Sequence, residues 1–540
     1  MQQFDYIIVG AGSAGCVLAN RLSESGRHKI LLLEAGPDKE SFWVRTPAGV
    51  PFLYANPDLN WMYHSSEEPM LGGRRVYHPR GMLMGGSSAI NGMVYIRGNH
   101  WDYDRWAAEG NAGWSAADVL PYFRRAETNL DHVDQYHGAT GPLRVARARY
   151  GVPVVDAFVE SGAAAGLPLT DDFNGAGQEG AQRYQFTISE GTRNSTARAY
   201  LRPARARDNL TLLDRAMVRE LIVEGAFVKG VRYMRGGAEF CAYARETILS
   251  GGAINSPQLL MLSGIGPAPH LKEQGIEVVH DLPGVGKNLQ DHISAQLNYE
   301  TRRGMSLNKA LSGWRKYANG ARYLLTRSGP LSLGSSQAAA FIRTDPEAPA
   351  PDIQISFRAW SFDFNGKGRL RMHSYPGVQA VAILLRPESR GALTLNRNEA
   401  RAAPELRFNY LSEAADRATL LRGMRWMRRI ASVGPFGEAV LRERGPGEDI
   451  ESDDDLLAYI SQNAQSVMHP VGTCKMGVGS DAVVDPLLRV HGLKGLRVVD
   501  ASIMPYVVSG NTNAPTIMIA ERAADLILAA TNPSSNGGLP

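Results

Sequence analysis

Short apolar runs separated by a helical pattern open the chain. Residues 5–9 (D-Y-I-I-V) predict a buried strand, residues 16–22 (C-V-L-A-N-R-L) a helix, and residues 29–34 (K-I-L-L-L-E) a second strand. The order strand, helix, strand is that of a β-α-β unit. The first part of the chain is therefore expected to be of the α/β class.

Further strands are predicted in the middle of the chain. Residues 211–250 contain short strand-like runs separated by glycines, which we place beside the first unit. A second group has a turn, R-P-E-S-R-G, between two of its members, and comprises residues 352–357, 378–385, 392–396 and 406–410. The chain as a whole is thus expected to be α/β at its start and α+β overall.

Length and composition set limits on function. A chain of 540 residues is too long for a single hydrophobic core and suggests about two to four domains. Apolar residues at 44% and charged residues at 21% are ordinary for a globular protein. The net charge of +4 comes without a run of clustered Lys or Arg, so nucleic acid is not expected as a partner.

The cysteines and the apolar stretches indicate a compartment. Cys16, Cys241 and Cys474 lie far apart with no C-x-x-C, which argues against a disulfide framework and favours a reducing, cytoplasmic setting. The first apolar run is too short and acidic for a signal peptide. No uncharged stretch approaches the ~20 residues that cross a bilayer. Peripheral attachment to the inner membrane stays open.

A glycine motif lies between the first predicted strand and helix. In G-A-G-S-A-G, Gly10 suits a tight turn, Gly12 lets the backbone approach a pyrophosphate, and Gly15 lets helix pack on strand. Glu34 ends the second strand, where a carboxylate accepts hydrogen bonds from a ribose diol. These residues predict a dinucleotide site without separating NAD from FAD. A nucleotide-free unit is disfavoured, because every context condition of the motif is met.

A second glycine-rich segment favours FAD. Residues 79–91 (P-R-G-M-L-M-G-G-S-S-A-I-N) place two glycines and two serines before a predicted helix start. Such a segment brings backbone N–H groups and hydroxyls against a second part of a long cofactor. NAD enzymes do not need this second loop.

Four blocks resemble the glucose-methanol-choline (GMC) oxidoreductases, which are FAD-dependent alcohol oxidases and dehydrogenases. The blocks begin at D-Y-I-I-V-G-A-G-S-A-G, P-R-G-M-L-M-G-G-S-S-A-I-N, G-A-I-N-S-P-Q-L-L-M-L-S-G-I-G and S-V-M-H-P-V-G-T-C-K-M-G, and the last continues through V-V-S-G-N-T-N-A-P-T. They extend from residue 5 to about residue 528, so the resemblance covers nearly the whole chain. It is nearest to choline-dehydrogenase-like and aliphatic alcohol dehydrogenases.

The resemblance implies a discontinuous, two-part layout. A Rossmann-like FAD-binding domain is expected from residues 1–155, 200–300 and 465–535. A substrate-binding domain built on an antiparallel sheet is expected from residues 156–199 and 301–464, and residues 531–540 are expected to form a flexible tail. The strands predicted after residue 350 agree with this sheet.

The resemblance also implies contacts to FAD, residue by residue. Some members attach the flavin through a histidine, but Ile90 stands at that position, so FAD is expected to be non-covalent. The expected cofactor residues are Gly10, Gly12, Gly15, Glu34, Gly85, Gly86, Ser87, Asn91, Gly92, Val218, Asp500 and Ala501.

Residues 466–477 (S-V-M-H-P-V-G-T-C-K-M-G) allow several interpretations by themselves. His469 with Cys474 lacks the further ligands that a metal needs, so no metal site is expected, and a Cys-His nucleophile would leave the flavin without a task. The resemblance implies that His469 is the base that takes the hydroxyl proton of an alcohol, with Asn511 as its partner, although Asn513 is an alternative. His292 is expected to serve folding rather than catalysis.

Met468 and Gln337 define the expected substrate pocket. Choline-specific relatives enclose a quaternary ammonium with aromatic rings and a carboxylate, whereas Met468 precedes His469 and Gln337 stands where relatives have glutamate. An uncharged aliphatic or aromatic primary alcohol is therefore expected, oxidised to the aldehyde with oxygen or a quinone as electron acceptor. The alternatives are a choline dehydrogenase, a flavin-containing lyase of the same fold and a non-catalytic flavoprotein.

Overall fold

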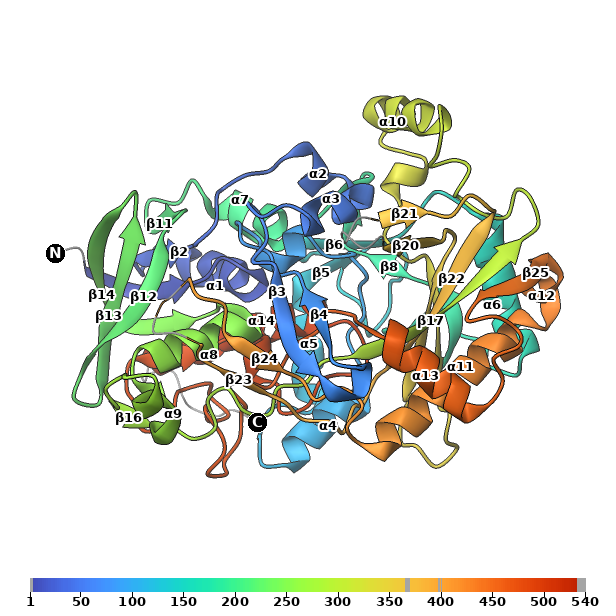
Figure 1. Cartoon of the computed structure of the whole chain (residues 1–540). Helices are drawn as coiled ribbons and strands as arrows, with labels where there is room; N and C mark the ends of the chain where they lie inside the picture. Colours follow the sequence, from blue (N-terminus) through green and yellow to red (C-terminus); the bar gives the residue numbers. More distant parts are fainter. Residues whose placement is uncertain (1–2, 365–369, 397–398, 400, 532–540) are drawn as a thin grey trace.

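Two seven-stranded sheets, one toward each end of the molecule, organise this computed structural model (Figure 1). The structure describes residues 3–364, 370–396, 399 and 401–531. The tail predicted at residues 531–540 lies, after Thr531, outside the described residues. None of the helices in the described part of the chain has the length and hydrophobicity needed to span a bilayer.

The first sheet is mostly parallel and confirms the predicted β-α-β unit. Strands β11, β2, β1, β14 and β27 run parallel, and β13 and β12 continue the sheet from β14 in antiparallel pairing. Its strands are β1 (Gln3–Val9), β2 (Ile30–Leu33), β11 (Leu210–Leu213), β12 (Met217–Glu224), β13 (Phe227–Arg235), β14 (Ala238–Leu249) and β27 (Leu496–Val498). The strands predicted within residues 211–250 lie beside the first unit, as expected.

The second sheet is antiparallel throughout. In spatial order it contains β25 (Val440–Gly445), β17 (Ile293–Thr301), β22 (Gly377–Leu384), β19 (Ile353–Arg358), β18 (Ala338–Ile342) and β7 (Gly180–Arg183), with β26 (Gln465–Ser466) also paired to β17. The other two predicted strands, β23 (Ala392–Thr394) and β24 (Glu405–Arg407), pair with each other outside this sheet. The domain boundaries themselves remain a prediction.

The remaining strands form small ribbons, and the helices cover the sheets. The ribbon strands are β3 (Tyr63–Glu68), β4 (Arg74–His78), β5 (Glu127–Asn129), β6 (Leu143–Arg147), β8 (Gln185–Phe186), β9 (Ile188–Ser189), β10 (Thr192–Arg193), β15 (Ile265–Gly266), β16 (His280–Asp281), β20 (Phe362–Phe364) and β21 (Leu370–Met372). The α-helices are α1 (Ser13–Ser23), α2 (Phe42–Arg45), α3 (Val50–Tyr54), α4 (His100–Ala108), α5 (Ala116–Ala126), α6 (Pro153–Ala164), α7 (Arg202–Ala204), α8 (Gly252–Leu262), α9 (Ala268–Glu273), α10 (Arg315–Thr326), α11 (Ala414–Ala431), α12 (Gly434–Ala439), α13 (Asp453–Asn463) and α14 (Asn513–Thr531).

Side-chain alternation gives the second sheet two different faces. On β19, Ile353, Ile355 and Phe357 are fully buried, and the Phe357 ring stacks on Phe158 of α6 with centroids 4.4 Å apart. The intervening residues, residues 354, 356 and 358, are Gln, Ser and Arg, and they line a cavity. Because successive side chains of a strand point to opposite faces, helices cover the apolar face and the polar face is left for a ligand.

A buried carboxylate on α14 joins the two ends of the chain. Glu521 is fully buried, and its Oε1 and Oε2 accept hydrogen bonds from Arg21 of α1 at 2.8 and 2.9 Å. The same carboxylate accepts from Arg125 Nε of α5 and from the Tyr200 hydroxyl, both at 2.8 Å. A buried charge is tolerated only when it is paired and hydrogen-bonded, so Glu521 fixes α14 against the first sheet's helices.

Candidate active site

One large cavity, of about 2240 Å³, extends from the turn after β1 to the polar face of the second sheet. Most of the residues singled out in the sequence line it. They are Gly10, Gly12, Glu34, Gly86, Ser87, Asn91, Gly92, Val218, Gln337, Met468, His469, Asp500, Ala501 and Asn511. Gly15 and Gly85 are not among the lining residues. Folding thus gathers most of the predicted set around one space, while the individual roles remain predictions.

The end of the cavity next to β1 has the geometry of a phosphate site. Gly10 adopts φ +98°, a conformation that favours glycine, and a Cβ at Gly15 would lie 1.9 Å from the Gly10 carbonyl oxygen. Helix α1 follows Gly12 without a side-chain cap, so its first N–H groups are free to bind an anion.

Glu34 places a buried carboxylate beside this turn. Its Oε2 accepts a hydrogen bond from the Ala11 N–H at 2.9 Å and its Oε1 from the Gly36 N–H at 2.8 Å. Burial raises the pKa of Glu34 to about 7. Each oxygen keeps a lone pair for a further donor, such as a ribose hydroxyl, and such donors favour the ionised form.

A second glycine loop, residues 85–92, packs directly on the first. Gly86 adopts φ +51°, and a Cβ there would lie 2.7 Å from the Cα of Gly12. Asn91 is held by Arg193, whose Nη1 donates to the Asn91 Oδ1 at 2.8 Å. Because both loops present backbone groups to one cavity, the residues fit a ligand longer than a mononucleotide.

Asp500 connects the strand β27 with the start of helix α8. Its Oδ2 accepts from the Gly252 N–H at 2.8 Å and the Ser256 hydroxyl at 2.6 Å, and its Oδ1 accepts from the Ser502 N–H at 2.8 Å. Burial raises the pKa of Asp500. The carboxylate therefore fixes this wall of the cavity.

His469 and Asn511 meet farther along the cavity. Asn511 Nδ2 lies 3.1 Å from His469 Nε2, and His469 Nδ1 lies 3.0 Å from His292 Nδ1. His292 Nε2 lies 2.9 Å from the Leu385 carbonyl oxygen, which only accepts, so His292 carries its proton on Nε2 and accepts at Nδ1. His469 must then donate from Nδ1. The lone pair of His469 Nε2 is left facing Asn511.

Both imidazoles are held in the neutral form. Burial lowers the pKa of His292 to about 4. Burial, together with the nearby His292 and Arg80, lowers the pKa of His469 well below 6.5. The Asn511 Oδ1 is buried without a hydrogen-bond partner among the described residues. Of the two candidate asparagines, Asn511 contacts His469, whereas Asn513 accepts from the Ser13 hydroxyl at 2.7 Å.

A buried aspartate holds the loop that carries His469. The Asp291 Oδ1 accepts from the His469 N–H at 2.6 Å, and its Oδ2 accepts from the hydroxyls of Ser466 and Tyr410, both at 2.5 Å. Burial raises the pKa of Asp291 to about 6 despite these donors. The sequence pointed to neither Asp291 nor the contact of His292 with His469, because both depend on the pairing of Ile293 with Ser466 across distant segments.

The wall of the cavity on the second sheet carries a guanidinium. Arg358 stacks on Phe362, with 5.6 Å from its Cζ to the ring centroid, and no carboxylate of the described residues forms an ion pair with it. Gln337 uses its amide internally, donating to the Gly334 carbonyl at 2.7 Å and accepting from the Ala359 N–H at 2.9 Å. Arg358 was not among the residues predicted from the sequence.

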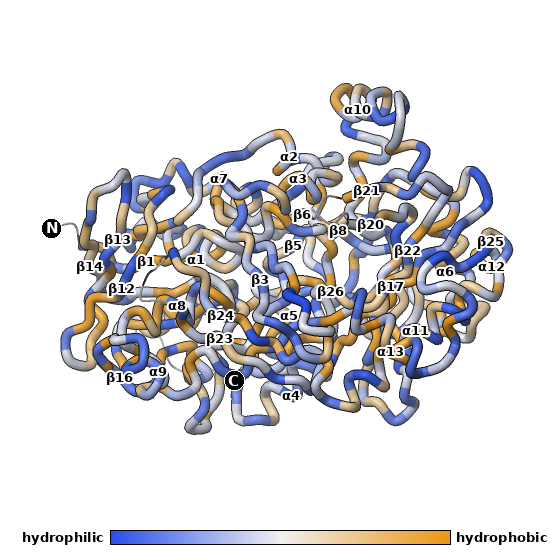
Figure 2. The backbone as a smooth tube through the Cα atoms, viewed as in Figure 1, coloured by the Kyte–Doolittle hydropathy of each residue, from blue (hydrophilic) through white to orange (hydrophobic). Residues whose placement is uncertain are grey.

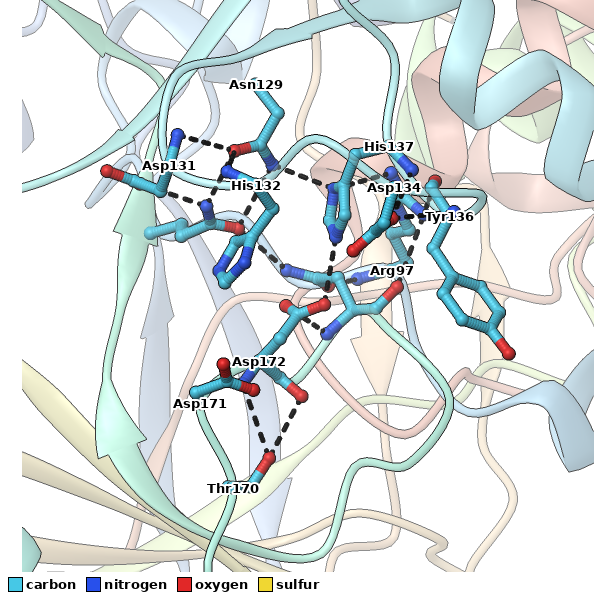
Figure 3. Close-up of polar contacts among 12 residues, drawn as sticks. Arg97, Asn129, Asp131, His132, Asp134, Tyr136, His137, Thr170, Asp171 and Asp172 are labelled. Carbon is cyan, nitrogen blue, oxygen red and sulfur yellow. Dashed lines mark hydrogen bonds and ion pairs between the residues drawn. The ribbon is translucent and has the colours of Figure 1, made fainter.

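Figure 3 shows a second group of titratable side chains, around His137, and its members Arg97, Glu127, His137 and Asp172 do not line this cavity. His137 lies between two carboxylates, with Nδ1 2.9 Å from Glu127 and Nε2 2.8 Å from Asp172, and Arg97 donates to the same Glu127 oxygen at 2.8 Å. These partners raise the pKa of His137 to about 9, against the effect of burial. The group is an ion-pair network, in which Glu127 Oε2 has no hydrogen-bond partner among the described residues. Within the described residues no cluster of three or more His, Cys, Asp or Glu could hold a metal ion.

The sequence profile of the GMC oxidoreductase family matches residues 4–294 and 387–520. The chain is similar to the oxygen-dependent choline dehydrogenase of Burkholderia multivorans, with 44% identity over 97% of this chain and 94% of that protein. It is similar in structure to pyridoxine 4-oxidase from Mesorbium loti, with a TM-score of 0.88 and 31% identity over 96% of this chain and 98% of that one. Formate oxidase from Aspergillus oryzae gives a TM-score of 0.91 and 26% identity over 98% of this chain and 99% of that one.

Proposed function

As a member of the GMC oxidoreductase family, the chain is an FAD-dependent enzyme acting on CH–OH groups, and we propose that it oxidises an uncharged primary alcohol to the aldehyde. The proposal rests above all on the lone pair of His469 Nε2 facing Asn511 on the cavity wall. Bound FAD supplies the acceptor, at flavin N5, for the hydride that leaves the α-carbon.

FAD fits the residues that line the cavity. The uncapped start of α1 and the turn at Gly10 and Gly12 would hold the pyrophosphate, and Glu34 would hold the adenosine ribose. The loop of residues 85–92 would lie along the flavin. Ile90 replaces the histidine that attaches flavin in some members, so acid precipitation of the enzyme should leave all flavin in solution.

His469 is proposed as the base. A neutral imidazole can accept the hydroxyl proton at Nε2, whose lone pair faces the Asn511 amide, and its Nδ1–H, held by His292, aims that lone pair at the cavity. Asn511 Nδ2 is proposed to donate to the alcohol oxygen and stabilise the charge that develops there. An alcohol hydroxyl between His469 and Asn511 could donate to His469 Nε2 and accept from Asn511 Nδ2.

The charge of the cavity wall supports an uncharged substrate. Arg358 lies on this wall without an ion-pair partner among the described residues, and its guanidinium already lies over the ring of Phe362. Met468 adds no aromatic ring, and Gln337 adds no charge. These features disfavour a cationic alcohol.

Choline is the second candidate, because relatives with 41–44% identity over nearly the whole chain are choline dehydrogenases. An anaerobic screen that follows bleaching of the flavin absorbance separates the two. Primary alkanols and benzyl alcohols should reduce the flavin with higher kred/Kd than choline. A clear preference for choline would overturn the assignment of an uncharged substrate.

The same screen separates oxidation from the remaining alternatives. A lyase or a non-catalytic flavoprotein would show no alcohol-dependent bleaching. For the non-catalytic flavoprotein, His469→Ala would in addition change no property except stability. Oxygen and a quinone are the two proposed electron acceptors. Reoxidation of the reduced enzyme by air, compared with reoxidation by a soluble quinone, identifies which one is used.

A further inference from the structure

Helix α10 exposes an apolar stripe to solvent. Figure 1 shows α10 standing away from the rest of the molecule, and Figure 2 shows that it carries both hydrophobic and hydrophilic positions. Trp314, at its N-cap, is 73% exposed, Tyr317 71%, Leu324 57% and Leu325 84%. Their spacing of three, seven and one residues places them along one side of the helix. The apolar side of α10 therefore faces outward, where a globular protein normally places its polar side.

The same segment is basic and contains no acid. Between Glu300 and Asp345 the chain has no Asp or Glu, and its cations are Arg302, Arg303, Lys309, Arg315, Lys316, Arg322, Arg327 and Arg343. Among the described residues only Arg343 of this group forms an ion pair, with Glu179 at 2.9 Å. The positive charge around the apolar stripe is thus not neutralised within the described part of the protein.

Few contacts hold α10 to the body, and they leave the stripe uncovered. Tyr323 is its fully buried residue, and the Tyr323 hydroxyl donates to the Gly191 carbonyl at 3.0 Å. Two residues of the stripe, Tyr317 and Leu324, also line the cavity that contains His469. The exposed stripe is therefore continuous with one wall of the substrate cavity.

We propose that α10 docks the enzyme on an anionic lipid membrane surface. Aromatic and aliphatic side chains on one side of a helix, flanked by Lys and Arg, are the combination that binds in the plane of a headgroup region. The un-neutralised cations match anionic headgroups and would repel a second copy of this basic segment. Docking through the surface of α10 does not depend on the reaction at His469.

The test uses the full-length holoenzyme and sedimentation with vesicles. Vesicles of phosphatidylglycerol and phosphatidylethanolamine (1:1) should bind the enzyme at low salt, while vesicles of phosphatidylcholine alone should bind it at least about tenfold less. Each cation near an anionic surface accounts for about a fivefold gain in partitioning. The triple variant Arg315→Gln, Arg322→Gln, Arg327→Gln should therefore bind about 100-fold more weakly. The double variant Trp314→Ser, Leu325→Ser should lose at least about tenfold.

Matched variants on other surfaces serve as controls. Lys229→Gln, Arg232→Gln, Arg235→Gln on β13 removes the same charge, and Val133→Ser, Leu169→Ser removes side chains that are 94% and 90% exposed. Both should bind vesicles as the parent enzyme does. None of the substituted residues lines the cavity, so flavin content and alcohol oxidation in buffer should be unchanged and will show that the variants fold.

A dye attached to α10 tests whether this helix itself contacts the membrane, whatever the affinity of the whole protein. Cys241 is exposed, so a polarity-sensitive dye at Leu325→Cys is placed in a Cys241→Ser background. A blue shift of its emission on anionic vesicles supports the proposal. Three results would overturn it: no binding to anionic vesicles, equal loss in the α10 and control variants, or sedimentation equilibrium showing that Trp314→Ser, Leu325→Ser breaks a dimer that does not bind vesicles.

Discussion

His292 donates its Nε2–H to the Leu385 carbonyl and so presents a lone pair to the Nδ1 of His469, 3.0 Å away. This relationship fixes which nitrogen of His469 carries the proton. A histidine expected to serve folding alone thus lies in the contact that orients the proposed base. Because His469 separates it from Asn511, the role we propose for His292 is that of a positioning residue.

His292→Ala should slow flavin reduction without abolishing it. Loss of the acceptor at Nδ1 lets His469 protonate either nitrogen and rotate, and outer partners of this kind contribute about 10- to 100-fold. His292→Asn retains a carbonyl that can accept from His469 Nδ1 and should recover part of the rate. Anaerobic stopped-flow gives both rate constants. Equal rates for parent and His292→Ala would contradict the orienting role.

Asn511→Ala should lower the reduction rate more than substrate affinity. The amide is proposed to act on charge that develops during reaction, and removing one such donor reduces the rate about 10²–10³-fold. Asn511→His restores an N–H donor at this position and should recover part of the rate. A Kd effect without a rate effect would show that Asn511 binds substrate only.

The rate should fall in acid as Asp291 takes up a proton. The pKa of Asp291 is raised to about 6, and a protonated carboxyl can no longer accept from His469, Ser466 and Tyr410 together. The reduction rate should therefore be level above about pH 7 and decline through about pH 6, with protonation of His469 following at lower pH. Asp291→Asn should lack the step near pH 6. If Asp291→Asn showed the same fall in rate near pH 6, that fall would be due to another titrating group.

Gly86→Ala should prevent retention of FAD. A Cβ would lie 2.7 Å from Gly12 Cα and push the two glycine loops apart. Gly225→Ala is the matched control, because Gly225 also has positive φ, +58°, but a Cβ there meets nothing within 4 Å. Both variants carry the backbone strain of about 1 kcal/mol that a positive φ imposes. Only Gly86→Ala should purify without flavin absorbance, and retention of flavin would show that the loops can separate harmlessly.

Stability should fall in base as His137 loses its proton. The folded pKa, about 9, lies above the usual 6.5, so protonated His137 stabilises the fold fully below pH 6.5 and this contribution is lost as pH rises through about 9. The contribution is on the order of 3 kcal/mol. His137→Gln should unfold at a denaturant midpoint that changes less between pH 6.5 and 9 than that of the parent. If the parent and His137→Gln showed the same pH dependence of the midpoint, a group other than His137 would be responsible for it.

Local motifs made part of this architecture predictable. Gly10, Gly12 and Glu34 belong to a single β-α-β unit, whose strands and turn depend on neighbouring residues alone. Arg358 and the contact of His292 with His469 were not predicted, because their places follow from registers such as Ile353 with Leu384 and Ile293 with Ser466. A strand pattern identifies which residues share a face, but it does not specify what a distant strand places opposite them.

The hydrogen bonds to Glu521 of α14 can form only after most of the chain has been synthesised. The residues that donate to Glu521, which are Arg21, Arg125 and Tyr200, are synthesised before it. The hydroxyl of Ser13, at the start of α1, likewise donates to Asn513, which is synthesised late. Pairing across such separations is completed late in folding. Asn513 and Thr516 of α14 line the cavity, so we expect a ribosome-bound chain that has not yet released α14 to lack one wall of the FAD site and to acquire flavin only after this helix has emerged.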